Sequence, residues 1–406
     1  MPHSSDQAPG AARPATAVDA IAERYVARLA ELSPEFAVYN GLPGRRGELD
    51  DYSPEGLAAL SDLDRSTLRE LDGVEAADDV DRVTVAAMRE RLGVGLDLAD
   101  AGEDLRSLNN IDSPVQTLRD GFDNLPTATE EDWADFASAL RAVPRALDQY
   151  ARSLRLARSR GDVAARRQVG AAISQARDQA GEATSSYTAL IDGAATADGA
   201  PLPPALAAEL REAAAVARRG YARLADFLAE EILPEAGRAD AVGRERYERF
   251  SREFLGAVVD LDETYEWGRE RLAAIDAEQR AIAERLYGPG TGVREAMDRL
   301  NADPARTVHG TAALRDWMQQ TSDRAMAALD GVHFDIPAPL RTLECRIAPS
   351  ATGGIYYTGP SDDFSRPGRM WWSVPAGTED FATWQERTTV FHEGVPGHHL
   401  QVGMQT

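Results

Sequence analysis

The chain contains no lysine and only one cysteine among its 406 residues. All 44 basic side chains are therefore arginine and, against 67 acidic residues, they leave a formal net charge of −23. A surface this acidic repels phosphate backbones and anionic lipids, so we expect neither nucleic acid nor a membrane as a partner. The single cysteine, Cys345, excludes an internal disulfide framework and is typical of a cytoplasmic protein.

Long hydrophobic runs are also absent. No stretch of about eighteen apolar residues occurs, so the sequence predicts no membrane-spanning helix. Residues 1–14 lack the apolar segment of a secretory signal and predict a disordered tail. Aromatic residues are scarce, whereas Ala, Leu, Arg and Glu are abundant, and this mixture favours helix.

Helical periodicity dominates residues 15–336, which we interpret as one large helical body without an internal repeat. A loop is expected over 40–54. The helices are expected over residues 17–32, 54–72, 77–101, 129–160, 162–192, 203–231, 243–286, 291–301 and 309–330.

The pattern changes near Pro337. Short apolar and aromatic runs then alternate with Gly, Pro, Ser and Asp, which predicts strands at about 342–348, 354–358 and 370–374. A helix is expected again over 378–395. The sequence thus predicts a mainly α protein in which a small β-sheet and a functional helix occupy residues 337–406.

Three of the six histidines lie within one short stretch, FHEGVPGHHLQ, at residues 391–401. A lone histidine on a helix is more often packed or solvated than a metal ligand. Here His392 is followed by Glu393 and then by His398 and His399, and an ordinary helix end does not require such a cluster. The pattern therefore favours a metal site.

A regular helix cannot bring these histidines to one ion. His398 would point to another side of the helix, and His399 would lie roughly 10 Å further along the axis. Pro396 breaks the helical hydrogen bonding, and Gly397 permits unusual backbone angles, so the pair can turn the chain back towards His392. Spacing does not decide between the two histidines; we favour His398 as the ligand, with His399 as a donor behind the ligands or as packing.

At these residues the sequence resembles the bacterial domain-of-unknown-function family 885, described as zinc metallopeptidases similar to gluzincins. Its His-Glu-x-x-Pro-Gly-His-His-x-Gln signature matches here, and residues 356–368 (YYTGPSDDFSRPG) resemble its Tyr-Tyr segment, with Phe364 in place of the usual Gly. The resemblance implies a gluzincin-like architecture in which His392 and His398 bind zinc and Glu393 is the general base. It also implies a third ligand, a glutamate on a later helix, which this chain does not reach before Thr406, so we expect the family's C-terminal portion to be missing.

Such a zinc ion would activate a water molecule, and Glu393 would take its proton during hydrolysis of a peptide substrate. Tyr356 or Tyr357 could donate a hydrogen bond to the developing oxyanion, and Arg366 could pair with a substrate carboxylate. Each has an alternative role, because paired tyrosines in a strand are often packing and Arg366 could brace a turn.

Two other functions stay open at this point. The chain could be a catalytically incomplete fragment or a helical scaffold that retains the motif, or it could be another metal-assisted amide or ester hydrolase. The sequence does not indicate the peptide specificity, the choice between endo- and exo-action, or the oligomeric state.

Overall fold

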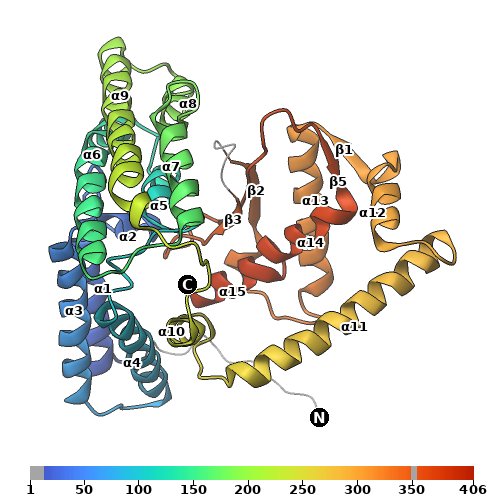
Figure 1. The fold of residues 1–406 in the computed structure, drawn as a ribbon, viewed down its shortest axis with the longest axis horizontal. Coiled ribbons are helices and arrows are strands. Elements are labelled where there is room, and N and C mark those ends of the chain that lie inside the picture. The colour runs from blue at the N-terminus through green and yellow to red at the C-terminus, as the bar shows by residue number, and fades with distance from the viewer. Residues whose placement is uncertain (1–12, 349–353) are drawn as a thin grey trace.

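The computed structural model describes residues 13–348 and 354–406 and shows a mainly helical protein with a small β-sheet (Figure 1). This confirms the predicted fold class. Its α-helices are α1 (Ala17–Leu32), α2 (Pro34–Tyr39), α3 (Pro54–Asp72), α4 (Asp79–Asp100), α5 (Pro114–Asp120), α6 (Glu130–Ser159), α7 (Arg166–Ala180), α8 (Ser186–Asp192), α9 (Pro204–Phe227), α10 (Arg244–Leu255), α11 (Leu261–Tyr287), α12 (Val293–Asn301), α13 (Thr311–Leu329), α14 (Thr383–Glu393) and α15 (Gly397–Gln405).

In the described part of the chain, five short strands form two sheets between residues 307 and 382. They are β1 (Thr307–His309), β2 (Leu343–Ile347), β3 (Ile355–Thr358), β4 (Gly368–Trp372) and β5 (Asp380–Ala382). The three-stranded sheet has the order β2-β4-β3, with β2 parallel and β3 antiparallel to β4. β1 and β5 pair antiparallel as a separate ribbon.

The first hydrophobic core lies between α6, α7 and α9, drawn in green in Figure 1. Tyr187, Tyr221 and Phe122 are its largest fully buried rings. Helices α6 and α9 approach closely at Gly220, where an added Cβ would lie 3.0 Å from the Cα of Pro144. A small residue at this crossing therefore lets the two backbones approach each other. We call the group of α6, α7 and α9 the N-terminal bundle.

The second core surrounds the three-stranded sheet. Alternate residues of the strands, including Met370 and Trp372, point to one face. Helices α13, α14 and α15 contribute Met318, Val390 and Leu400 to the same cluster. The other face of the sheet, which carries Trp371, turns towards the N-terminal bundle. This alternation follows from the two-residue period of a strand. One face of the sheet therefore belongs to the second core, and the other faces the N-terminal bundle.

Two of the expected helices are each divided in the structure. The segment expected as one helix over 162–192 forms α7 and α8, and the segment expected over 243–286 forms α10 and α11. Gly256 ends α10 with a φ of 64°, a left-handed conformation that glycine adopts at little cost and that stops a helix. Residues 380–382, expected as helix, form β5 because they pair with β1.

Candidate metal centre

The helix is interrupted between Glu393 and Gly397, where the sequence predicts a break. Helix α14 ends at Glu393, and its last turn is closed by a hydrogen bond from the N–H of Gly394 to the carbonyl of Val390, 2.9 Å long. Pro396 cannot donate to the preceding turn, and α15 begins directly after it. The result is two helices instead of one continuous helix, and we call the break between them the corner.

Gly397 allows this corner to be tight. A Cβ on Gly397 would lie 1.9 Å from the carbonyl oxygen of His392 and 2.6 Å from that of Phe391. These are backbone atoms, so no side-chain rotation would relieve the overlap. The first turn of α15 therefore rests directly on the last turn of α14, and only glycine fits between them.

The corner places the side chains of His392, Glu393 and His398 together. The two imidazole rings lie with their centroids 4.7 Å apart and nearly perpendicular to each other. Each His Nε2 is 4.0 Å from an oxygen of the Glu393 carboxylate, and one ligand atom from each residue lies within 4.8 Å of the others. These are residue types that bind divalent metal ions, and the group lies close enough together that it could hold one.

Gln401 contacts the outer nitrogen of His398. Its Oε1 lies 3.3 Å from the His398 Nδ1, and in the tautomer in which Nδ1 donates to this oxygen the lone pair is on Nε2. That Nε2 is the atom that faces Glu393. An outer hydrogen bond of this kind orients a metal-ligating histidine.

Glu393 occupies the most enclosed position of the three residues. Its side chain is 11% exposed, compared with 66% for His392 and 39% for His398. Burial raises the pKa of the Glu393 carboxyl above its ordinary value, although the two neighbouring imidazoles oppose the shift. A carboxylate with a raised pKa beside an open metal position is suited to accept a proton from a bound water.

His399 has a different environment from its neighbour. It is completely buried, its Nε2–H donates to the carbonyl oxygen of Leu340 at 2.7 Å, and its Nδ1 accepts from the hydroxyl of Tyr357 at 2.9 Å. Both ring nitrogens are therefore engaged by protein groups, and burial lowers the pKa of the ring, which keeps it neutral. His399 anchors α15 to the sheet and has no nitrogen free for a metal.

The two tyrosines of β3 point to opposite faces of the sheet. The hydroxyl of Tyr357 is engaged by His399 on the face that packs against α15. Tyr356 stacks on Trp371 on the other face, with ring centroids 6.1 Å apart, and its hydroxyl lies 3.4 Å from Asp123. The structure thus places Tyr357 directly behind the cluster and Tyr356 across the sheet from it.

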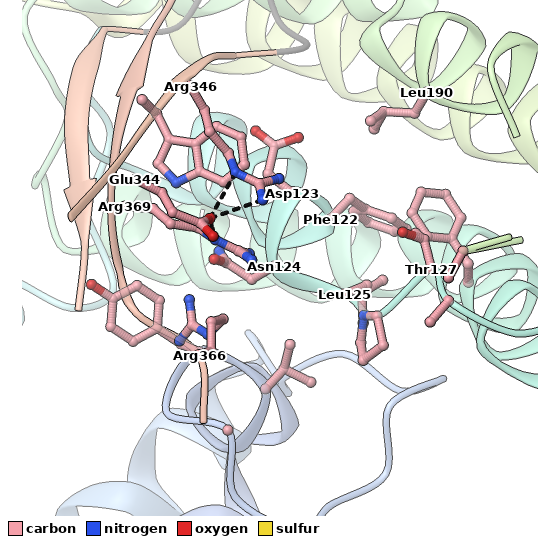
Figure 2. Close-up of a pocket in the computed structure, with 18 of the residues that line it drawn as sticks. Phe122, Asp123, Asn124, Leu125, Thr127, Leu190, Glu344, Arg346, Arg366 and Arg369 are labelled. Carbon is pink, nitrogen blue, oxygen red and sulfur yellow. Dashed lines mark hydrogen bonds and ion pairs between the residues drawn. The ribbon is translucent and has the colours of Figure 1, made fainter. Parts of the chain in front are cut away.

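Arg366 lies at the edge of a large cavity between the N-terminal bundle and the outer face of the sheet (Figure 2). The cavity has a volume of about 1170 Å³. None of the three cluster residues is among its lining. Arg366 is nevertheless close enough to Tyr357 for its charge to oppose the rise that burial causes in the pKa of the tyrosine hydroxyl.

Sequence reasoning assigned no role to Gln401 and did not consider Leu340. Gln401 stands three residues after His398 on the same helix, a spacing at which side chains meet, so this contact was readable from the sequence. The carbonyl of Leu340 gave no such signal, because it reaches His399 across 59 residues of chain.

The three side chains are of types that bind zinc, but they are too few to provide all of its ligands. Two imidazole nitrogens and a carboxylate are ligands that zinc accepts, and a catalytic zinc also needs an open position for water. Among residues 13–348 and 354–406, no further His, Cys, Asp or Glu joins the three within the same spacing. If Glu393 serves as a base, the described part of the chain offers two protein ligands.

Fold and cluster together define a helical protein with a His–Glu–His group at a helix corner. The family model for bacterial proteins of unknown function, DUF885, matches residues 34–406. The chain therefore belongs to this family. No protein among the curated sequences matches it.

Two solved structures share the fold. One is described as a "putative lipoprotein" from Colwellia psychrerythraea, with a TM-score of 0.78 and 17% identity over 96% of this chain and 72% of that one. The other is described as a "putative lipoprotein of unknown function" from Shewanella oneidensis, with a TM-score of 0.61 and 14% identity over 95% of this chain and 72% of that one.

Within the described ranges, this chain has no helix with the length and apolarity needed to span a bilayer.

Proposed function

We propose that the chain carries the metal-binding and proton-transfer groups of a zinc-dependent peptidase with a gluzincin-like arrangement. The observation that supports this most strongly is the approach of His392, Glu393 and His398 around one point, produced by the Gly394–Gly397 corner.

His392 and His398 would hold the ion through their Nε2 atoms, with His398 oriented by Gln401. The bound zinc would supply an activated water and polarise the carbonyl of the substrate. Glu393 would accept the proton of that water and deliver it to the leaving amine, a role for which its partly buried carboxyl is suited. His399, Leu340 and Tyr357 would fix the position of α15 and thus of His398.

A Glu393→Gln variant tests the role of the carboxylate. The substitution keeps size and leaves both histidines in place, so we expect zinc binding to be retained while hydrolysis of a peptide library falls by at least about a hundredfold. Loss of zinc together with activity would instead make Glu393 a ligand. Equal activity in both proteins would contradict the proposed base.

A competing function is a scaffold that retains the motif without turning over substrate. The two-histidine set favours this alternative, because a catalytic zinc has three protein ligands in well-characterised enzymes. Zinc-loaded protein that cleaves neither peptides nor esters would support the scaffold. Cleavage of esters alone would support another metal-assisted hydrolase.

The cellular location belongs with these proposals. The lone Cys345 is buried and free, which is compatible with a reducing cytoplasm, and we propose that location. The two structural neighbours carry the description "putative lipoprotein". Fractionation of cells that express the protein distinguishes cytoplasm from envelope.

A further inference from the structure

The cavity between the N-terminal bundle and the sheet is cationic, although the protein as a whole is strongly acidic. Its described lining contains five arginines and two acidic residues, whereas the chain carries a net charge of −23. The arginines are contributed by distant parts of the sequence: Arg46, Arg315, Arg346, Arg366 and Arg369. A positive cavity in an acidic surface concentrates anions.

Four of these arginines already have carboxylate partners. Arg346 and Arg369 share the carboxylate of Glu344, at 2.8 and 2.9 Å, and Figure 2 shows both side chains directed at it. Arg46 pairs with Asp132 at 3.3 Å, and Arg315 pairs with Asp316 at 2.7 Å. Their charges are largely compensated by the protein.

Arg366 is the exception. Within residues 13–348 and 354–406 its guanidinium makes no hydrogen bond and no ion pair, and it lies half-buried apart from the Glu344 group in Figure 2. Burial and the nearby charge of Arg369 lower the pKa of Arg366. A half-buried guanidinium gains several charge-assisted hydrogen bonds when an anion arrives.

The turn that carries Arg366 is held firmly, so the side chain is not bracing it. Asp363 accepts from both Ser361 and Ser365 at 2.7 Å, and the N–H of Arg366 donates to Ser361 at 2.9 Å. The N–H of Ser361 donates back to the carbonyl of Arg366 at 3.0 Å. Arg366 contributes only its backbone to these bonds, and its guanidinium takes no part in them.

We propose that Arg366 binds a carboxylate of the peptide substrate, so that this cavity selects peptides that carry one. The inference rests on the proposed function, since the ligand is the substrate of the metal centre. Arg366 is close enough to Tyr357 for its charge to act on the pKa of the tyrosine hydroxyl, and that hydroxyl bonds His399, the neighbour of His398. A planar guanidinium suits the two oxygens of a carboxylate better than an ammonium would.

Calorimetric titration of the metal-free chain tests this without any hydrolysis. The probes are N-acetyl-trialanine with a free carboxylate, its C-terminal amide, and N-acetyl-Ala-Glu-Ala-amide. We expect the free acid to bind at least about tenfold more tightly than the amide. We expect Arg366→Gln to abolish this preference, and Arg280→Gln, which removes an exposed arginine on α11, to keep it.

The third probe identifies the source of the carboxylate. Tight binding of the free acid alone would identify the C-terminal carboxylate, whereas tight binding of the glutamyl amide would identify an acidic side chain; either preference must depend on Arg366. Equal binding of all three peptides by the unaltered chain would overturn the proposal, and so would a preference that survives Arg366→Gln.

The outcome is separable from that of the metal centre. Carboxylate selectivity in a chain that binds no zinc would retain the cavity proposal and reject the peptidase. Zinc-dependent cleavage of acid and amide peptides at equal rates would retain the peptidase and reject the cavity proposal.

Discussion

Replacing Gly397 with alanine would place a methyl group inside the corner that unites the cluster. The new Cβ would lie 1.9 Å from the carbonyl oxygen of His392, whereas a Cβ does not come closer than about 3.0 Å to another heavy atom. The start of α15 must therefore retreat from α14 by about 1.1 Å, the difference between these two distances. Because the obstructing atoms are backbone, the movement shifts His398 away from His392.

A zinc site tolerates errors of only about 0.2 Å in its ligand distances. A shift of about 1 Å is several times larger, so we expect zinc affinity to fall by at least tenfold to a hundredfold, comparable with the loss of an orienting group. Overpacking of this kind also costs about 1–3 kcal/mol of unfolding free energy. Competition with a chromophoric chelator measures the affinity, and urea unfolding measures the stability.

Gly170→Ala supplies the matched control. Gly170 lies inside α7, and apart from the backbone of its own helix no atom lies within 4 Å of the place that an added Cβ would take. Alanine is the better helix former there, so we expect unchanged zinc affinity and up to about 1 kcal/mol of added stability. If Gly397→Ala binds zinc as tightly as the unaltered chain, the corner does not set the geometry of the site.

Three further predictions follow from other contacts. Gln401→Ala should lower zinc affinity about tenfold with no loss of stability, since Gln401 is exposed and orients only His398; unchanged affinity would refute that role. Tyr357→Phe should cost about 1–3 kcal/mol in urea unfolding, because it leaves the buried His399 Nδ1 without a donor, and an unchanged midpoint would show that water replaces the hydroxyl. Burial and Asp50 raise the pKa of Glu35 to about 7, so the folded state retains a proton that the unfolded state releases near its ordinary value of 4.5. The free energy of unfolding should therefore fall as pH rises from about 4.5 to 7, by a few kcal/mol at most. Glu35→Gln should make this dependence on pH weaker. If the free energy of unfolding depends on pH equally in both proteins, Glu35 is not the group responsible.

Local signals in the sequence predicted much of the helical body. Helix α3 has the bounds that the sequence indicates, because Ser53 caps its N-terminus and Pro54 suits its first turn. The three strands of the main sheet are within two residues of their expected positions, because each is an apolar run between turn residues. The corner at Pro396 was also readable, because proline removes the hydrogen bond that a continuous helix needs.

Features that depend on contacts between distant parts of the chain could not be predicted from the sequence. The sequence does not distinguish His398 from His399 by spacing, and the difference appears only when Tyr357 and Leu340 engage both nitrogens of His399. The division of the segment over 243–286 depends on one glycine, which a helical pattern tolerates. The cationic cavity is likewise invisible in a chain of overall negative charge, because its arginines are separated by up to about 320 positions.

Helix α13 precedes the predicted boundary near residue 337 and packs into the core of the sheet. Helix α13 ends at Leu329, before that boundary, yet its Leu314 and Met318 belong to the core of the sheet. Hydrophobic periodicity shows that a helix has a buried face but does not show which neighbour covers it. Packing across the boundary therefore needed the three-dimensional structure.

Zinc content of the purified chain tests the central claim most directly. We expect about one zinc per chain after dialysis against a buffered micromolar concentration of the metal, and its loss in both His392→Ala and His398→Ala. His309→Ala, which removes an exposed histidine on β1, should retain the metal. Absence of zinc from the unaltered chain, or its retention in either cluster variant, would contradict the account of the site.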